Sequence, residues 1–140
     1  MKPWQHLFQT AMADGETYFN AGEYHRARLL FQEAYERIPE PQRNYAESTQ
    51  ALSGLADCFY YLENYEKAKG LLDDVLFCPG GAASPTVRLR RGQIFFKTGD
   101  VEKAKMELTA AYLNGGMAVF HNEEECMRLI ANVIEGYERR

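Results

Sequence analysis

The side chains that most often carry catalysis or bind metals are few in this sequence and far apart. His6, His25 and His121 lie in three separate regions, and no two ligand-type residues have a zinc spacing such as C-x₂-C or H-x₃-H. Neither G-x-x-x-x-G-K-[ST] nor G-x-G-x-x-G is present, so no phosphate-binding loop is visible. We therefore predict that the protein is not an enzyme and has no catalytic residues, no metal and no cofactor.

The remaining reactive residues have simpler structural interpretations. Cys58, Cys78 and Cys126 are an odd number of cysteines without a disulfide framework, which favours small buried hydrophobic residues in a reducing compartment. Cys58 could pair in space with a histidine as a nucleophile, but no motif marks it as activated. The acidic run at 123–125 favours the N-terminus of a helix over an acid/base pair.

Composition bounds the class of protein. The chain has 140 residues, of which 46% are hydrophobic and 26% charged, as expected for one globular domain over 1–140. The net charge of −4 argues against nucleic acid as a partner, and no apolar run approaches the ~18 residues of a membrane span. Because Met1-Lys2-Pro3-Trp4 does not begin a signal peptide, we expect a cytoplasmic protein. Its oligomeric state, monomer or homodimer, stays open.

Three similar segments recur along the chain, and each lies between two amphipathic helical patterns. They are Gly22–Arg28, Glu63–Lys69 and Gly99–Lys105. In each, an aromatic residue precedes an alanine at the same spacing: Tyr18 and Ala27, Phe59 and Ala68, Phe95 and Ala104. A single helix–turn–helix unit of this kind cannot bury its apolar face alone, so the units must stack. The pattern predicts a helical repeat protein.

Small and large residues around these segments follow one motif. Its copies are Gly15-x-x-Tyr18 with Ala27-x-x-x-Phe31, Ala56-x-x-Phe59 with Ala68-x-x-x-Leu72, and Gly92-x-x-Phe95 with Ala104-x-x-x-Leu108. On these residues the chain resembles tetratricopeptide-repeat proteins over roughly 11–116. The resemblance implies an all-α solenoid of antiparallel helix pairs with a C-terminal capping helix. The repeats would cover about 8–39, 49–80 and 85–116, and the capping helix about 122–139.

Local signals predict the helix boundaries and the contacts within each pair. The first helix should run from Pro3 to about Asn20, and a third should begin after Pro39 and Pro41 and reach about Leu62. Ser84, Asn64 and Asp100 are predicted N-caps, and the glycine pairs 80–81 and 115–116 predict helix ends. Gly15, Ala56 and Gly92 should be small because the second helix of each pair passes close to them. The capping helix should present one apolar face, formed by Cys126, Leu129, Ile130, Val133, Ile134 and Tyr137.

In the family that the chain resembles, the first helices of the pairs line a concave groove. The positions that the packing motif leaves free form one stripe on each first helix. The predicted partner-binding groove consists of Met12, Glu16, Phe19, Asn20, Ser53, Asp57, Tyr60, Tyr61, Leu89, Arg90, Gln93, Phe96 and Lys97. Aromatic and methionine side chains supply much of the binding energy at interfaces, so the groove predicts a protein or peptide partner. The alternative is that Phe19, Tyr60 or Phe96 packs beneath a neighbouring element.

Arg88 and Arg91 depart from the motif because they occupy positions that are usually apolar. Either they pair with acidic residues and extend their aliphatic stems along the apolar surface, or the third first-helix is rotated relative to the usual packing. Arg90 and Lys97 give this part of the groove a basic character, which suits either an acidic partner or an ordinary solvated face.

The resemblance leaves three functions open. The carboxylate clamp of chaperone-binding repeat proteins is not expected, because its positions carry Met12, Glu16, Gly54, Thr86 and Arg90, of which only Arg90 fits. A non-catalytic protein-interaction module is the main interpretation. Three repeats in a small acidic chain are also similar to the chaperones of bacterial secretion systems. The third unit, from Arg88 to Phe120, is similar to small bacterial repeat proteins of toxin loci, which are presumed immunity proteins.

Overall fold

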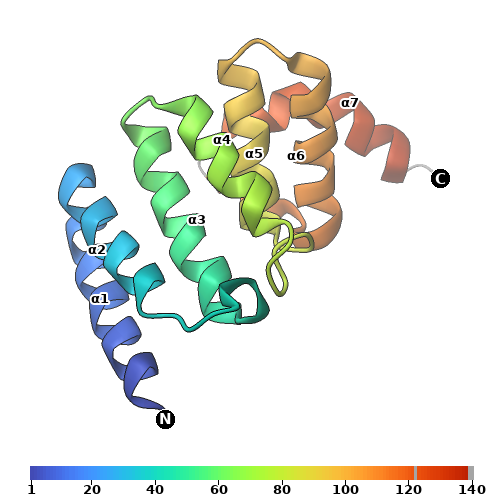
Figure 1. The fold of residues 1–140 in the computed structure, drawn as a ribbon. Helices are drawn as coiled ribbons and strands as arrows, with labels where there is room; N and C mark the ends of the chain where they lie inside the picture. The colour runs from blue at the N-terminus through green and yellow to red at the C-terminus, as the bar shows by residue number, and fades with distance from the viewer. Residues whose placement is uncertain (122, 139–140) are drawn as a thin grey trace. The chain divides into compact units, whose positions relative to one another are not determined.

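The computed structural model describes residues 1–121 and 123–138, with side chains described through residue 131, and every regular element among them is helical. The elements, in chain order, are α1 Pro3–Asn20, α2 Tyr24–Glu36, η1 Gln42–Asn44, α3 Ala46–Tyr61, α4 Tyr65–Val75, α5 Pro85–Lys97, α6 Val101–Gly115, η2 Met117–Phe120 and α7 Glu124–Glu138 (Figure 1). The protein is therefore all-α, as predicted.

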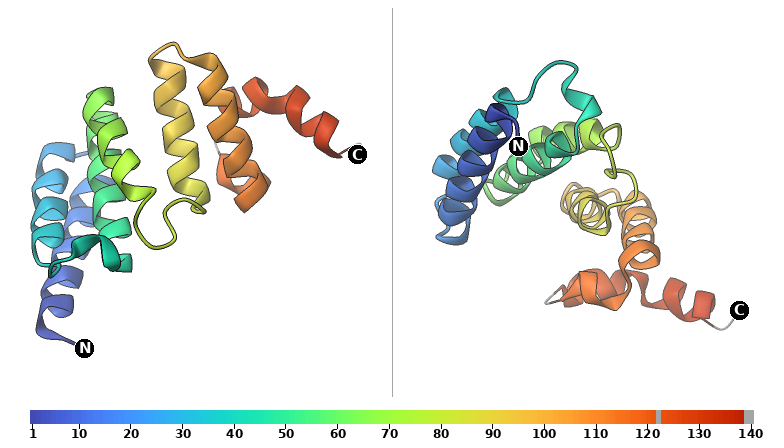
Figure 2. Two further views of the ribbon diagram at one scale, coloured as in Figure 1. Left: turned by 45° about the vertical axis from the view of Figure 1, so that its right-hand side comes forward. Right: turned by 90° about the horizontal axis from the view of Figure 1, so that it is seen from below.

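The chain forms two compact units. Unit 1 covers Met1–Ala82 and holds α1 to α4, and unit 2 covers Ala83–Arg140 and holds α5 to α7. Within the units, the paired helices run antiparallel and side by side, which both views of Figure 2 show for α1 with α2 and for α5 with α6. Unit 1 thus consists of two helical hairpins, α1–α2 and α3–α4, and unit 2 of the hairpin α5–α6 followed by α7.

The predicted N-caps are confirmed. The side chain of Asn64 accepts a hydrogen bond from the backbone N–H of Lys67 at the start of α4, and Asp100 does the same for Lys103 at the start of α6. Ser84 caps α5 through the N–H of Val87. Each cap satisfies an N–H group that has no partner inside its helix.

One predicted helix boundary is correct and another is wrong. The third helix begins at Ala46, after Pro39 and Pro41, and a 3₁₀ turn at Gln42–Asn44 occupies the connection. The fourth ends at Val75, well before the glycine pair at 80–81. The glycines serve the following turn instead: Gly80 has a φ of 74°, and a Cβ at position 81 would lie 1.8 Å from the carbonyl oxygen of Val75. The predicted stop at Gly116 is correct, with a φ of 70° directly after α6.

The close contacts predicted within the hairpins are present. A Cβ at position 15 would lie 2.7 Å from the Phe31 ring, and a Cβ at position 92 would lie 2.6 Å from Leu108. Ala56 is fully buried. Small residues on one helix therefore receive large ones from the next, as ridges-into-grooves packing requires.

Arg88 and Arg91 pair with one acidic residue of the neighbouring helix. Arg88 Nη1 lies 3.0 Å from Oε2 of Glu107, and Arg91 Nε lies 3.2 Å from Oε1 of the same carboxylate. The three side chains are only 22%, 10% and 13% exposed. Of the two alternatives for these arginines, ion pairing is therefore the correct one, and the ion pairs occupy part of the interface between α5 and α6.

The last helix closes unit 2. Cys126 and Ile130 of α7 are buried against Leu108 and Ala111 of α6 and against Phe120, and Leu129 packs beside them. This contact is the capping role predicted for the segment. Val133, Ile134 and Tyr137, which were predicted for the same face, lie outside the described side chains.

Basic side chains lie over the motif aromatics at one repeat position. The charged group of Arg26 lies 5.6 Å from the ring centre of Tyr18, and that of Lys67 lies 4.8 Å from the ring centre of Phe59. In the third copy, Lys103 lies 5.7 Å from the ring centre of Phe95. Each cation precedes the alanine of the motif by one residue and partly covers the ring with a favourable cation–π contact.

Candidate functional site

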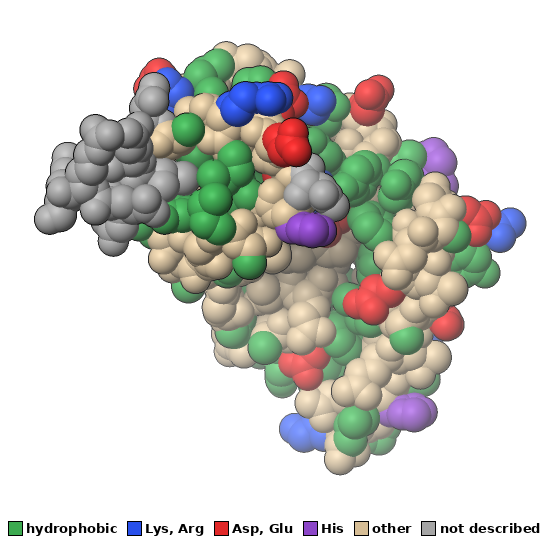
Figure 3. All heavy atoms as spheres, turned by 180° about the vertical axis from the view of Figure 1, so that it is seen from behind, with side chains coloured by type: hydrophobic (Ala, Val, Ile, Leu, Met, Phe, Trp, Pro, Cys, Tyr) green, Lys and Arg blue, Asp and Glu red, His purple; other side chains and the backbone are tan. Residues whose placement is uncertain are grey.

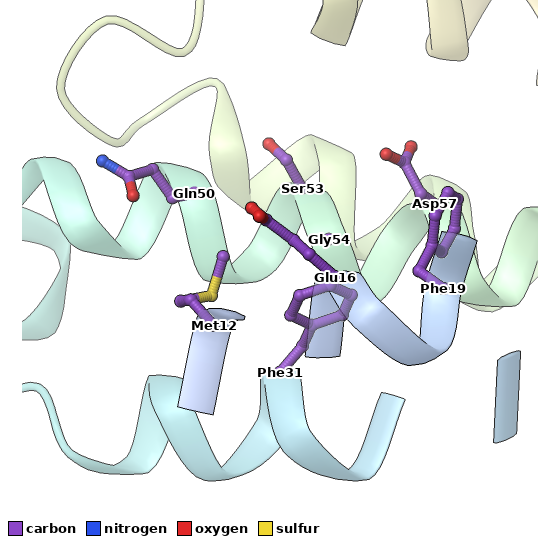
Figure 4. A pocket seen from close by; sticks show the side chains of 8 residues that line it. All are labelled: Met12, Glu16, Phe19, Phe31, Gln50, Ser53, Gly54 and Asp57. Atoms are coloured by element: carbon purple, nitrogen blue, oxygen red, sulfur yellow. The ribbon is translucent and has the colours of Figure 1, made fainter. Parts of the chain in front are cut away.

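Unit 1 contains a pocket of about 290 Å³ between α1 and α3. Five predicted groove residues line it, and they come from both helices: Met12, Glu16, Phe19, Ser53 and Asp57 (Figure 4). Three residues outside the predicted groove set complete the lining: Phe31, Gln50 and Gly54, the last of which was named only as a position of the carboxylate clamp. The stripes predicted on two separate helices thus meet around one cavity.

Phe31 lies at the bottom of this pocket. Its side chain comes from α2 and is only 3% exposed. A Cβ at Gly15 would lie 2.7 Å from the ring, and one at Gly54 would lie 3.1 Å from it, so glycines of α1 and α3 flank the ring. A larger residue at either position would displace Phe31, and therefore the two glycines determine the depth of the pocket.

The polar part of the lining is acidic. Glu16 and Asp57 contribute two carboxylates, and the eight lining residues include no lysine, arginine or histidine. Gln50 and Ser53 add an amide and a hydroxyl group. The Ser53 hydroxyl oxygen is enclosed, and it has no hydrogen-bond partner among the described residues, which is uncommon for a buried polar group.

An aromatic cluster adjoins the pocket through Phe19. Its five members are Phe19, Tyr24, Tyr60, Tyr61 and Tyr65. Tyr24 and Tyr61 stack with ring centres 5.0 Å apart, and Phe19 meets both rings edge-on at 5.3 and 5.6 Å. Tyr60 meets Tyr61 and Tyr65 edge-on at 5.2 and 5.7 Å. The rings of Phe19 and Tyr60 are half-buried in this cluster, whereas Tyr61 is 44% exposed.

The groove residues predicted in unit 2 differ in exposure. Leu89 packs against the core that α6 and α7 share, and Gln93 is only 6% exposed and accepts a hydrogen bond from Arg90 Nη1 at 3.0 Å. Phe96 is half-buried, and Lys97 is exposed, as is Asn20 in unit 1. Leu89 and Gln93 therefore present little surface to a partner.

The sequence contained a signal for one of the three missed residues. Gln50 lies one helical turn before Ser53 and two turns before Asp57, so extending that stripe towards the N-terminus of α3 would have included it. Phe31 was assigned to packing within its own hairpin, which is correct but incomplete. Gly54 has no side chain, and it became a lining residue only because the Phe31 ring approaches it from the preceding hairpin.

Hydrophobic side chains also reach the surface elsewhere. On the face shown in Figure 3 they appear in several places, with acidic side chains between them. Strongly exposed examples are Leu29, Phe77, Met106, Leu113 and Met117. Met106 and Leu113 share α6, Leu29 belongs to α2, and Phe77 lies in the turn after α4 with Arg43 at 5.8 Å from its ring centre.

The thiols of Cys58 and Cys126 lie in buried surroundings. Burial raises the pKa of the Cys58 thiol to about 12 and that of Cys126 to about 11, so both remain protonated at neutral pH. No group of three metal-ligating side chains occurs in the described part of the chain. No described helix is both long and apolar enough to cross a membrane.

Comparison with known proteins gives a likeness of fold. The sequence matches no protein-family model, and it matches no curated protein. The structure is similar to that of the Yersinia enterocolitica type III secretion chaperone SycD, solved in complex with a peptide of the translocator YopD. The TM-score is 0.67, with 14% sequence identity over 95% of this chain and 93% of SycD. The chain therefore has the tetratricopeptide-like helical fold of that chaperone.

Proposed function

We propose that this protein is a non-catalytic binding module of the tetratricopeptide-repeat type, and that the pocket between α1 and α3 receives part of a protein or peptide partner. One observation carries the proposal: residues at equivalent repeat positions of two successive hairpins line one cavity. Methionine and aromatic side chains provide its apolar surface, and side chains of these kinds dominate binding energy at interfaces. The exposed Tyr61 extends this surface beyond the pocket.

The volume of the pocket supports a peptide more than a cofactor. At about 290 Å³ it lies at the lower end of the ~300–1,000 Å³ of small-molecule sites. A cavity of this volume accommodates one side chain of a bound segment. The predicted contacts of Arg90, Phe96 and Lys97 on α5 remain part of the proposal.

Within this function, a secretion chaperone is the more specific candidate. The similar structure of SycD contains a translocator peptide, which supports an exported protein as the partner here. The chaperone would act in the cytoplasm and would hold an extended segment of that protein before export. Ordering such a segment costs entropy, so the affinity should be moderate.

The alternative of a toxin-neutralising immunity protein predicts a different complex. It would bind one folded partner at nanomolar affinity or tighter, and no short segment of that partner would suffice. Affinity capture from the native cell, followed by a scan of overlapping peptides from the captured protein, separates the two. A single peptide that binds as tightly as the whole partner favours the chaperone, and binding by the folded partner alone favours immunity.

The role of the pocket is tested by filling it. Gln50 is exposed on α3, so Gln50→Trp should obstruct the pocket at little cost in stability. We expect binding of the captured partner to weaken by about tenfold or more, as for loss of an interface hot spot of roughly 2 kcal/mol. Gln9→Trp, at an exposed α1 position outside the lining, is the matched control. Equal affinity of both variants would contradict the assignment of the pocket.

A further inference from the structure

We propose that the pocket between α1 and α3 selects a lysine or arginine side chain of the bound segment. This inference rests on the proposed function and specifies which residue of the partner occupies the cavity. The lining combines an apolar interior with two carboxylates and contains no basic side chain. A long aliphatic stem that ends in a cation is the side chain whose chemistry complements that arrangement.

The apolar part of the lining matches the stem. Met12 and Phe19 of α1 line the cavity, and the Phe31 ring between Gly15 and Gly54 forms its bottom. The methylene groups of a lysine or arginine would bury apolar area against these three side chains, as snorkelling residues do on protein surfaces. A short polar side chain would leave this surface uncovered.

The carboxylates match the charged end. Glu16 is exposed on α1, so its charge is available to a ligand at the pocket (Figure 4). Asp57 of α3 adds negative charge to the same lining. An ammonium or guanidinium group brings three to five N–H donors and no acceptor, which suits a lining whose charged members can only accept. An acidic side chain would instead meet like charges, and a wholly apolar one would leave Glu16 without a ligand partner.

The experiment is a selection of peptides from a phage-displayed random dodecapeptide library on the immobilised full-length protein. We expect the enriched peptides to share a lysine or arginine at one aligned position, flanked by apolar residues. Enriched peptides without a shared basic position would overturn this inference and leave the proposed function standing. A selection without any enriched peptide would overturn both.

A double-mutant cycle then assigns the contact to the pocket. A selected peptide is synthesised with its basic residue and again with norleucine, which keeps most of the stem and removes the charge. We expect norleucine to weaken binding to the natural protein about tenfold and to have little effect on Glu16→Gln. Glu66→Gln, which removes an exposed charge on α4 away from the pocket, should retain the full difference. If Glu16→Gln also retains the full difference in affinity between the basic peptide and the norleucine peptide, the basic residue of the peptide contacts another surface and the inference fails.

Discussion

The hairpins α1–α2 and α5–α6 share one motif and use it differently. In both, a glycine of the first helix receives a large side chain from the second, Phe31 at Gly15 and Leu108 at Gly92. In the first hairpin, the large side chain also forms the bottom of an open pocket. In the second, two arginines of α5 converge on Glu107. The motif therefore determines the contact between two helices, and the residues around it determine whether the surrounding space is open or filled.

The difference also has an energetic side. A buried carboxylate with cationic partners stabilises only while its partners remain, since an uncompensated buried charge is costly. An open pocket leaves apolar surface uncovered until a ligand binds. We therefore expect unit 2 to be sensitive to changes of charge at Glu107, and unit 1 to be sensitive to whether its pocket is occupied.

The largest effect on folding should come from removing α7, which covers the apolar end of unit 2 and has no counterpart in unit 1. Deletion of residues 122–140 would uncover Leu108, Ala111 and Phe120, which α7 covers with Cys126 and Ile130. We expect aggregation or self-association, measured by size-exclusion chromatography and light scattering. If the shortened protein is instead a fully helical monomer in solution, α7 is not required for folding, and α5 and α6 are stable without a capping helix.

The next effect concerns the ion pairs of unit 2. Glu107→Ala removes the carboxylate that Arg88 and Arg91 share, and breaking a buried pair in this way typically costs ~3–5 kcal/mol of unfolding free energy. Glu102→Ala, at an exposed position of the same helix, should change stability by less than ~0.5 kcal/mol. Urea titration of both variants provides the measurement. Similar midpoints would mean that α5 and α6 are held by apolar packing alone, as in unit 1.

Two glycine substitutions should change stability in opposite directions. Gly92→Ala places a Cβ 2.6 Å from Leu108, so we expect a loss of ~1–3 kcal/mol from overpacking, and Gly92→Leu should lose more. Gly70 lies inside α4, and a Cβ added there would meet no neighbouring side chain within 4 Å, so Gly70→Ala should stabilise the protein by ~0.5–1 kcal/mol. Thermal unfolding would measure both. Stabilisation by Gly92→Ala would refute the assigned contact in unit 2.

The smallest effect should appear at alkaline pH and should involve both units, through Cys58 and Cys126. Burial raises their pKa to about 12 and about 11, well above that of a thiol in the unfolded chain. Above the thiol pKa of the unfolded chain, the unfolded chain loses thiol protons that the folded chain keeps. The free energy of unfolding should therefore fall as the pH rises from that value towards the folded-state pKa values of about 11 and about 12. Cys58→Ala should flatten that decline, and at pH 8 iodoacetamide should label neither thiol before unfolding.

Local features of the fold could be predicted from the sequence, and contacts between hairpins could not. The N-caps at Asn64, Ser84 and Asp100 and the contacts at Gly15 and Gly92 depend on spacing within one hairpin, and all are present. The end of α4 was misplaced because the glycines at 80 and 81 belong to a turn that follows the helix, which already ends at Val75.

For the candidate site too, the residues that follow from periodicity within one helix could be predicted, and the contacts between hairpins could not. The stripes with Met12, Glu16 and Asp57 followed from helical periodicity, and these residues line the pocket. The contact of Phe31 with Gly54 links the first hairpin to the next, and periodicity within one helix contains no information about it. The burial of Gln93 was missed for a related reason, since its exposure depends on what surrounds α5.

The hairpins differ in which basic residue lies over the aromatic ring of the motif. Arginine occupies this position in the first hairpin, at Arg26, whereas lysine occupies it in the next two, at Lys67 and Lys103. Acetylation neutralises a lysine side chain and leaves an arginine charged, so an acetylating reagent would remove the charge of Lys67 and Lys103 but not that of Arg26. Phe59 and Phe95 would each keep one cation, because Arg28 lies 5.8 Å and Arg91 5.6 Å from their ring centres. Lysine modification would therefore change this repeat position in two hairpins, and an arginine would still lie over each motif ring.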